Sequence, residues 1–245
     1  MAVILYKNTV IVTALEEILQ RHPVWRGGAA FSRAAAVPSG FSVLDGELPG
    51  GGWPTGGLTE ILGLQQGIGE LRLLLPALAA LTTAGKRVIW LAPPHLPYAP
   101  ALAAAGVDLA RLAVVRAPGR RDSLWAAEQA LRSGACHALL AWFRNARYAE
   151  LRRLAVAAEA SCALVALFRP REAARESSPA CLRIALEPAQ GELAVRILKR
   201  RGAPAAAPLR VPLKSPLHAL GRSPSSPPAS RDARARRSLG LPVHA

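Results

Sequence analysis

The sequence predicts an α/β fold: a mostly parallel sheet, flanked by helices, with an antiparallel hairpin at its C-terminal end. Between residues 37 and 168, short apolar runs alternate with helix-like segments, which is the pattern of parallel sheets covered on both faces. A glycine-rich turn, residues 63–69, joins one of these strands to an apolar helix. Two later strand-like runs are separated by a short turn at Gln190-Gly191, which predicts the hairpin.

The individual elements follow from apolar periodicity and from the turn residues that bound each run. The expected strands are 58–62, 87–92, 112–116, 138–143, 163–168, 181–186 and 193–199. The expected helices are 71–83, 98–105, 122–133 and 147–160. Pro76 lies inside the first of these helices and is expected to kink it. Asp122 or Ser123 is expected to cap the third helix.

Composition divides the chain into three parts. Residues 1–36 read as an N-terminal helical arm and linker, because residues 8–21 carry apolar side chains at helical spacing before a Gly/Ala/Arg-rich stretch. Residues 37–201 hold the α/β pattern and form the core domain. Residues 202–245 are dominated by Pro, Ala, Ser and Arg and are predicted to be a disordered basic tail.

Charge and cysteine usage limit the classes of partner and compartment. The formal net charge is +15, which favours an acidic partner such as DNA or an acidic protein surface, although the arginine content of a GC-rich genome explains it equally well. The three cysteines are widely spaced and suggest neither a metal site nor a disulfide framework. We expect no secretory signal, because Lys7, Asn8, Glu16 and Glu17 interrupt the N-terminal apolar residues, and no apolar run is long enough to span a bilayer. The sequence therefore predicts a cytoplasmic protein without metal or cofactor.

The glycine-rich turn has the layout of a phosphate-binding loop but lacks its working residues. Such a loop reads G-x-x-x-x-G-K-[ST], where lysine neutralises phosphate charge and the hydroxyl holds Mg²⁺. Here Gly69 stands in place of the lysine and Glu70 in place of the hydroxyl residue. Backbone N–H groups of Gly63, Gly67 and Gly69 could still hold an anion, so nucleotide binding stays open as an alternative. Glu70 is instead expected to satisfy the N-terminal end of the following helix itself.

Several segments resemble the RecA core, and the resemblance covers residues 37–200. They read SGFSVLDGELPGGGWPTGGLTEILG, HLPYAPALAAAGVDLARLAVV and EQALRSGACHALLAW. The resemblance implies a RecA-like P-loop NTPase fold. At the positions that the resemblance assigns to the phosphate-clamping lysine and the Mg²⁺-binding hydroxyl, this chain has Gly69 and Glu70. Trp142 stands at the position of the metal-supporting aspartate, and Pro94 at that of the water-activating glutamate. Arg169-Pro170 stands at the position of the nucleotide-sensing residue. Because phosphoryl transfer needs these groups together, we expect that the protein is not an ATPase and has no catalytic residues.

Further motifs are similar to those of the ImuA family of bacterial SOS mutagenesis cassettes. They are VWRG, GGGWP, LAPPHLPYAPALAAAGVDL, WAAEQALRSGAC, LFRP and ILKRRG. The resemblance implies a non-catalytic adaptor in SOS-induced, error-prone translesion DNA synthesis, with RecA, ImuB and an error-prone DNA polymerase as partners. It also implies self-association and a place at the nucleoid. Two alternatives stay open: a SulA-like cell-division inhibitor of the SOS response, and a basic module that binds single-stranded DNA.

Candidate partner-binding or DNA-binding residues are one aromatic side chain and several cations. Trp25 lies on the N-terminal arm and could anchor a partner, or equally pack on its own domain. The cations follow predicted strands, at the edge where open α/β sheets place their ligands, or precede the tail. They are Arg144, Arg147, Arg152, Arg153, Arg169, Arg171, Lys199, Arg200 and Arg201. A solvated helix face is the alternative explanation of such charges.

Overall fold

The structure is a computed structural model that describes residues 36–64, 67–202 and 207–213. The predicted helical arm with Trp25 and the chain after Leu213 lie outside the described residues. Within the described residues no helix is long and apolar enough to cross a bilayer.

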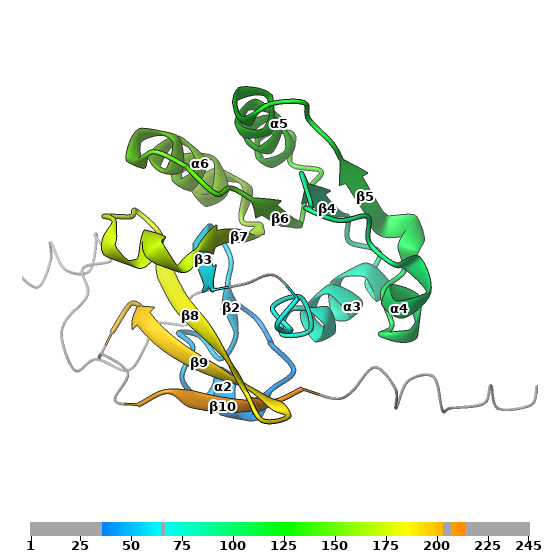
Figure 1. Cartoon of the computed structure of the whole chain (residues 1–245). Helices are drawn as coiled ribbons and strands as arrows, with labels where there is room; N and C mark the ends of the chain where they lie inside the picture. Colours follow the sequence, from blue (N-terminus) through cyan, green and yellow to red (C-terminus); the bar gives the residue numbers. More distant parts are fainter. Residues whose placement is uncertain (1–35, 65–66, 203–206, 214–245) are drawn as a thin grey trace, which may run out of the picture. The chain divides into compact units, whose positions relative to one another are not determined.

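The chain alternates strands and helices along most of its described length (Figure 1). The strands are β1 Ala36–Val37, β2 Trp53–Pro54, β3 Gly57–Gly63, β4 Val88–Leu91, β5 Leu112–Val115, β6 Ala138–Trp142, β7 Leu164–Pro170, β8 Leu182–Ala189, β9 Glu192–Lys199 and β10 Leu209–Pro212. The α-helices are α2 Ser42–Asp45, α3 Leu75–Thr83, α4 Ala99–Ala104, α5 Arg120–Arg132 and α6 Tyr148–Ser161, and the 3₁₀ helices are η1 Leu109–Arg111 and η2 Arg171–Arg175.

One sheet organises these elements, in the strand order β10-β9-β8-β3-β7-β6-β4-β5. The six strands from β8 to β5 are parallel, whereas β9 and β10 add antiparallel strands at one edge. The turn between β8 and β9 contains Gly191 with φ 69°, a conformation that favours glycine. The predicted α/β class, the mostly parallel sheet and the C-terminal hairpin are therefore confirmed.

Helices cover both faces of the sheet, so each face has its own apolar core (Figure 1). On one face, α3 and α4 bury side chains such as Leu78 and Leu102. On the other face, α5 and α6 bury Leu131 and Leu154. Parallel strands that are covered on both sides need apolar residues at successive positions, which explains the continuous apolar runs in the sequence.

Two helix starts differ from the sequence-based prediction. Helix α3 begins at Leu75, so Pro76 lies in its first turn, where a missing N–H costs no hydrogen bond, and the predicted kink is wrong. Helix α5 begins at Arg120 with Gly119 as its N-cap. Both predicted cap residues, Asp122 and Ser123, lie inside the helix instead, and the Ser123 hydroxyl donates to the carbonyl of Gly119 at 2.9 Å.

The fold also continues past residue 201, the predicted end of the core domain. Strand β10 pairs antiparallel with β9, and its Val211 is fully buried. Leu213, just after the strand, packs against the same core. The prediction of disorder from residue 202 is therefore wrong for β10. The alternation of Leu209, Arg210, Val211 and Pro212 is a strand signal, but the Pro- and Ala-rich surroundings hide it.

A buried ionic network joins three adjacent strands in the middle of the sheet. Glu60 of β3 is fully buried. Its Oε1 accepts from Nη1 of Arg169 in β7 at 2.9 Å, and its Oε2 accepts from Nε of Arg183 in β8 at 2.6 Å. A buried carboxylate is tolerated only when it is paired and hydrogen-bonded, and here two flanking strands supply the partners.

The same two arginines also hold the loops that follow β6 and β7. Arg169 Nη2 donates to the carbonyl of Ala146 at 3.1 Å and to the Glu176 carboxylate at 2.8 Å. Arg183 Nη2 donates to the carbonyl of Ala173 in η2 at 2.6 Å. Two carboxylates thus balance two guanidinium groups, and the network ties η2 and the segment before α6 to the sheet.

We expect Glu60→Ala to lower the free energy of unfolding by about 3–5 kcal/mol, because it leaves two arginines buried without their shared carboxylate. Urea unfolding of the full chain measures this change. The matched control is Glu187→Ala, which removes a half-exposed ion pair to Arg171 and should cost about 0–1 kcal/mol. Equal effects of the two substitutions would contradict the structural role of the network.

We expect Val211→Ala to lower the free energy of unfolding by about 1–3 kcal/mol, because the Val211 side chain of β10 is fully buried against the core. Arg210→Ala on the same strand is the control, since Arg210 is exposed and its contact with Glu192 is 3.8 Å long. The same unfolding measurement applies. If Val211→Ala left stability unchanged, β10 would not be part of the fold.

Candidate functional site

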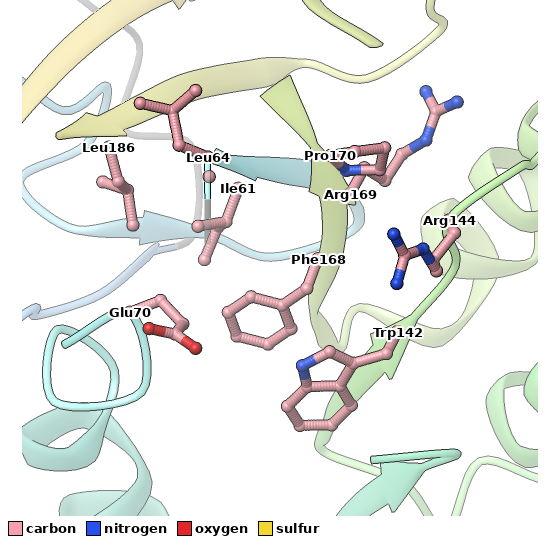
Figure 2. A pocket seen from close by; sticks show the side chains of 10 residues that line it. Ile61, Leu64, Glu70, Trp142, Arg144, Phe168, Arg169, Pro170 and Leu186 are labelled. Carbon is pink, nitrogen blue, oxygen red and sulfur yellow. The ribbon is translucent and has the colours of Figure 1, made fainter. Parts of the chain in front are cut away.

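A crevice lies at the carboxyl ends of β3, β6 and β7, the edge where open α/β sheets place their ligands. Its volume is about 240 Å³, and Figure 2 shows the side chains that line it. The crevice is lined by Ile61, Gly63, Leu64, Glu70, Trp142, Arg144, Phe168, Arg169, Pro170 and Leu186. It thus contains several positions that the sequence analysis compared with a nucleotide site.

The glycine-rich loop at this crevice uses its own backbone donors. Glu70 accepts a hydrogen bond from the Gly67 N–H at 2.8 Å and another from the Gly69 N–H at 3.1 Å. Glu70 thus satisfies two amides of the loop, whereas the sequence predicted that it would satisfy a helix N-terminus. Since α3 begins only at Leu75, the loop does not lead directly into a helix N-terminus. Two amides that could bind phosphate are therefore bonded to a carboxylate, and α3 starts beyond the loop, so both arrangements weaken the attraction for phosphate.

The place of the missing lysine is filled by another part of the chain. A Cβ atom built on Gly69 would lie 2.4 Å from Cδ1 of Leu213, and Gly69 has φ +109°, where a side chain is strained. Leu213 comes directly after β10, so the strand that the sequence analysis missed brings it over the loop. Restoring the lysine by substitution would therefore strain the backbone at Gly69 and require the Leu213 side chain to move.

Aromatic side chains occupy the position that the RecA resemblance assigns to a metal-supporting aspartate. Trp142 at the end of β6 stacks on Phe168 of β7, with ring centroids 4.6 Å apart and an interplanar angle of 14°. Figure 2 shows the pair in the middle of the crevice, between Glu70 and Arg144. Among the described residues there is no group of three side chains that could hold a metal ion. The crevice thus offers an apolar surface, which suits packing better than phosphoryl chemistry.

We expect that neither the wild-type chain nor the double variant Gly69→Lys/Glu70→Thr binds Mg²⁺-ATP. The variant restores the loop consensus, but Leu213 still occupies the lysine position. Titration with a fluorescent ATP analogue measures binding. Saturable binding by the wild type would show that the loop still holds nucleotide, and binding by the variant alone would show that Leu213 moves aside.

The predicted cation sites have different environments. Arg169 is buried, with 1% of its side chain exposed, and its guanidinium binds Glu60 and Glu176, so its prediction as a partner-binding residue is wrong. Arg169 is paired with Leu62 of β3, so it lies inside the sheet and not in the loop beyond the carboxyl end of β7. Sequence alone could not show this, because the acceptor Glu60 lies 109 residues away.

Most of the other predicted cations are at the surface. Arg144, Arg147 and Arg152 are exposed and form no ion pair with another described residue. Arg201 is also exposed. The remaining four are engaged within the chain: Arg153 with Glu128, Arg171 with Glu187, Arg200 with Glu47, and Lys199 with the carbonyl of Ser178. The structure does not gather them at the crevice, where only Arg144 joins the buried Arg169.

A second concave surface lies between α5 and α6 and was missed by the sequence analysis. We call it the α5–α6 groove; its volume is about 410 Å³. It is lined by Arg120, Arg121, Leu124, Trp125, Glu128, Glu150, Arg153 and Leu154. Trp125 is 61% exposed. One sequence feature could have revealed this surface. Trp125 does not lie on the apolar stripe that contains Ala127 and Leu131, so helical spacing places this large aromatic side chain on the solvent side of α5.

Comparison with known proteins finds one family over the middle of the chain. Residues 57–165 match the family model of the cell division inhibitor SulA. The cell division inhibitor SulA of Edwardsiella piscicida is 34% identical over 110 residues, which are 45% of this chain and 65% of that protein. The chain thus spans slightly less than two thirds of this relative's length. The matched segment runs from the start of β3 into β7 and is SulA-like; it includes the loop at Glu70 and the α5–α6 groove.

Proposed function

We propose that this protein is a non-catalytic, SulA-like inhibitor of cell division, which acts in the SOS response by binding the tubulin-like protein of the division septum. The observation that carries the proposal is the SulA match over residues 57–165, with 34% identity to a protein named as a cell division inhibitor. Such a function needs a protein-binding surface and no catalytic group.

The geometry of the crevice supports binding rather than catalysis. Glu70 occupies the loop amides, Leu213 fills the lysine position, and Trp142 stacks on Phe168 where a metal-supporting carboxylate would be needed. Hydrolysis of ATP depends on all three functions at once. A RecA-like origin of the sheet is part of the proposal, because the strand, loop and helix order at β3 and α3 is kept while the chemistry is absent.

A second candidate is the adaptor role in SOS-induced translesion DNA synthesis, with RecA, ImuB and an error-prone polymerase as partners. Its support is the extent of the fold. The SulA match ends in β7, whereas the sheet continues through β8, β9 and β10, and Arg183 of β8 completes the Glu60 network. The resemblance to RecA covers residues 37–200, which is nearly the whole described fold, and the motifs similar to the ImuA family extend over most of the chain before the tail. Self-association and a place at the nucleoid belong to this candidate.

The two functions differ in what the protein does when it is produced without DNA damage. We expect that induced expression in the native host makes cells grow as filaments, and that the septal protein co-purifies with the full chain. Microscopy and affinity capture measure the two outcomes. Glu60→Ala should abolish both effects by destabilising the fold, whereas Arg196→Glu, an exposed charge on β9, should leave both unchanged.

Normal division together with capture of RecA, ImuB or the polymerase would overturn the division-inhibitor proposal in favour of the adaptor. In that case, deletion of the gene should also lower the frequency of damage-induced mutation. Normal division with strongly salt-dependent binding of single-stranded DNA, and no captured protein, would favour the basic DNA-binding module instead.

A further inference from the structure

We propose that the α5–α6 groove is the docking site for an acidic segment of the partner protein, which places an apolar side chain against Trp125. The inference rests on the proposed function in one respect, namely that the chain acts by binding another protein. It does not depend on which of the two candidate partners is correct. It assigns a surface and a chemical class of ligand to that binding.

The shape and the exposed aromatic carry the first step. The groove lies where α5 and α6 pack on each other over the sheet, with Leu124 and Leu154 among its lining residues. Trp125 stands at this groove with 61% of its surface exposed. Tryptophan offers a large apolar area with few rotatable bonds and is enriched among the residues that dominate binding energy. Covering it removes the largest apolar side chain of this surface from water.

The charge of the two helices and of the loops that join them carries the second step. Residues 116–153 contain eight arginines and three acidic residues, Asp122, Glu128 and Glu150. Within the groove the carboxylates are already neutralised, since Glu128 binds both Arg132 and Arg153, and Glu150 binds Arg120. Arg121 has no ion pair with a described residue. The surface that remains for a ligand is therefore positive, and its complement is acidic.

The arrangement favours a peptide over a nucleic acid. A strand of phosphates would follow a continuous row of cations and stack successive bases on several aromatic side chains. The groove instead has a single tryptophan, and two carboxylates, Glu128 and Glu150, stand between its arginines. A peptide with acidic residues on either side of one apolar side chain fits this pattern. Its carboxylates can contact Arg121 and the exposed part of Arg153, and they avoid Glu128 because that carboxylate is buried.

The test uses the full chain labelled with 5-fluorotryptophan. The chain contains five tryptophans, and each is expected to give its own ¹⁹F signal. The Trp125 signal is assigned with Trp125→Phe. The probe is a short synthetic peptide with a central Leu-Phe-Leu flanked on both sides by Glu and Asp. Two further peptides replace the acids by Gln and Asn, or the apolar centre by Ser. We expect the first peptide to shift the Trp125 signal saturably, and both altered peptides to bind more weakly.

Two variants and two matched controls locate the site. We expect Trp125→Ala and Arg121→Glu each to weaken binding of the probe by about tenfold, the loss typical of a central interface residue. Tyr98→Ala removes an aromatic that is 70% exposed elsewhere, and Arg196→Glu reverses an exposed charge on β9, so both should bind as the wild type does. Equal binding by all four variants, or no binding of the probe, would overturn the docking site. Oligothymidylate that binds more tightly than the peptide and shifts Trp125 would overturn the peptide class.

The same variants separate this inference from the proposed function. If Trp125→Ala and Arg121→Glu still capture the septal protein, or RecA and ImuB, at the wild-type level, the groove is wrong and the proposed function stands. If the probe binds in the groove but the wild-type chain captures none of these proteins, the proposed function fails and the docking site stands.

Discussion

The carboxylate of Glu60 is the constraint on which the arrangement of the sheet depends. It is fully buried in β3 and is held by Arg169 of β7 and Arg183 of β8, the two strands that flank it. A buried charge without partners is too costly to keep, so the three strands must come together in this register. The consequence reaches far along the chain: fixing β8 fixes the hairpin to β9, β9 pairs with β10, and β10 carries Leu213 to the loop at Gly69.

This order of dependence also shapes the crevice, whose loop differs from a phosphate-binding loop in sequence and in contacts. At the two consensus positions the loop has Gly69 and Glu70 instead of a lysine and a hydroxyl residue. Glu70 satisfies the amides that would bind phosphate, and Leu213 lies where the lysine side chain would start. The stacked Trp142 and Phe168 give the crevice an apolar centre. At the α5–α6 groove, by contrast, Trp125 and Arg121 are exposed to solvent.

Prediction from sequence succeeded where the signal is local. The alternating apolar runs predicted the α/β class and the mostly parallel sheet, and comparison with the loop consensus showed that Gly69 stands in place of the lysine. It failed where a local signal was outweighed by its surroundings. Pro76 lies in a first helical turn, and β10 is hidden in a Pro- and Ala-rich stretch. Arg169 was placed at a surface because its acceptor Glu60 is remote in sequence.

The sequence by itself determined the order of strands and helices and the loss of the phosphate-binding residues, because periodicity and short motifs are properties of neighbouring residues. Only the tertiary structure decided which cations are buried and which are exposed, and which side chains form a groove. Those outcomes depend on pairs such as Glu60 with Arg183, and Gly69 with Leu213, whose members are far apart in sequence. Burial and electrostatic pairing are properties of such contacts, and they exist only once the sheet has formed.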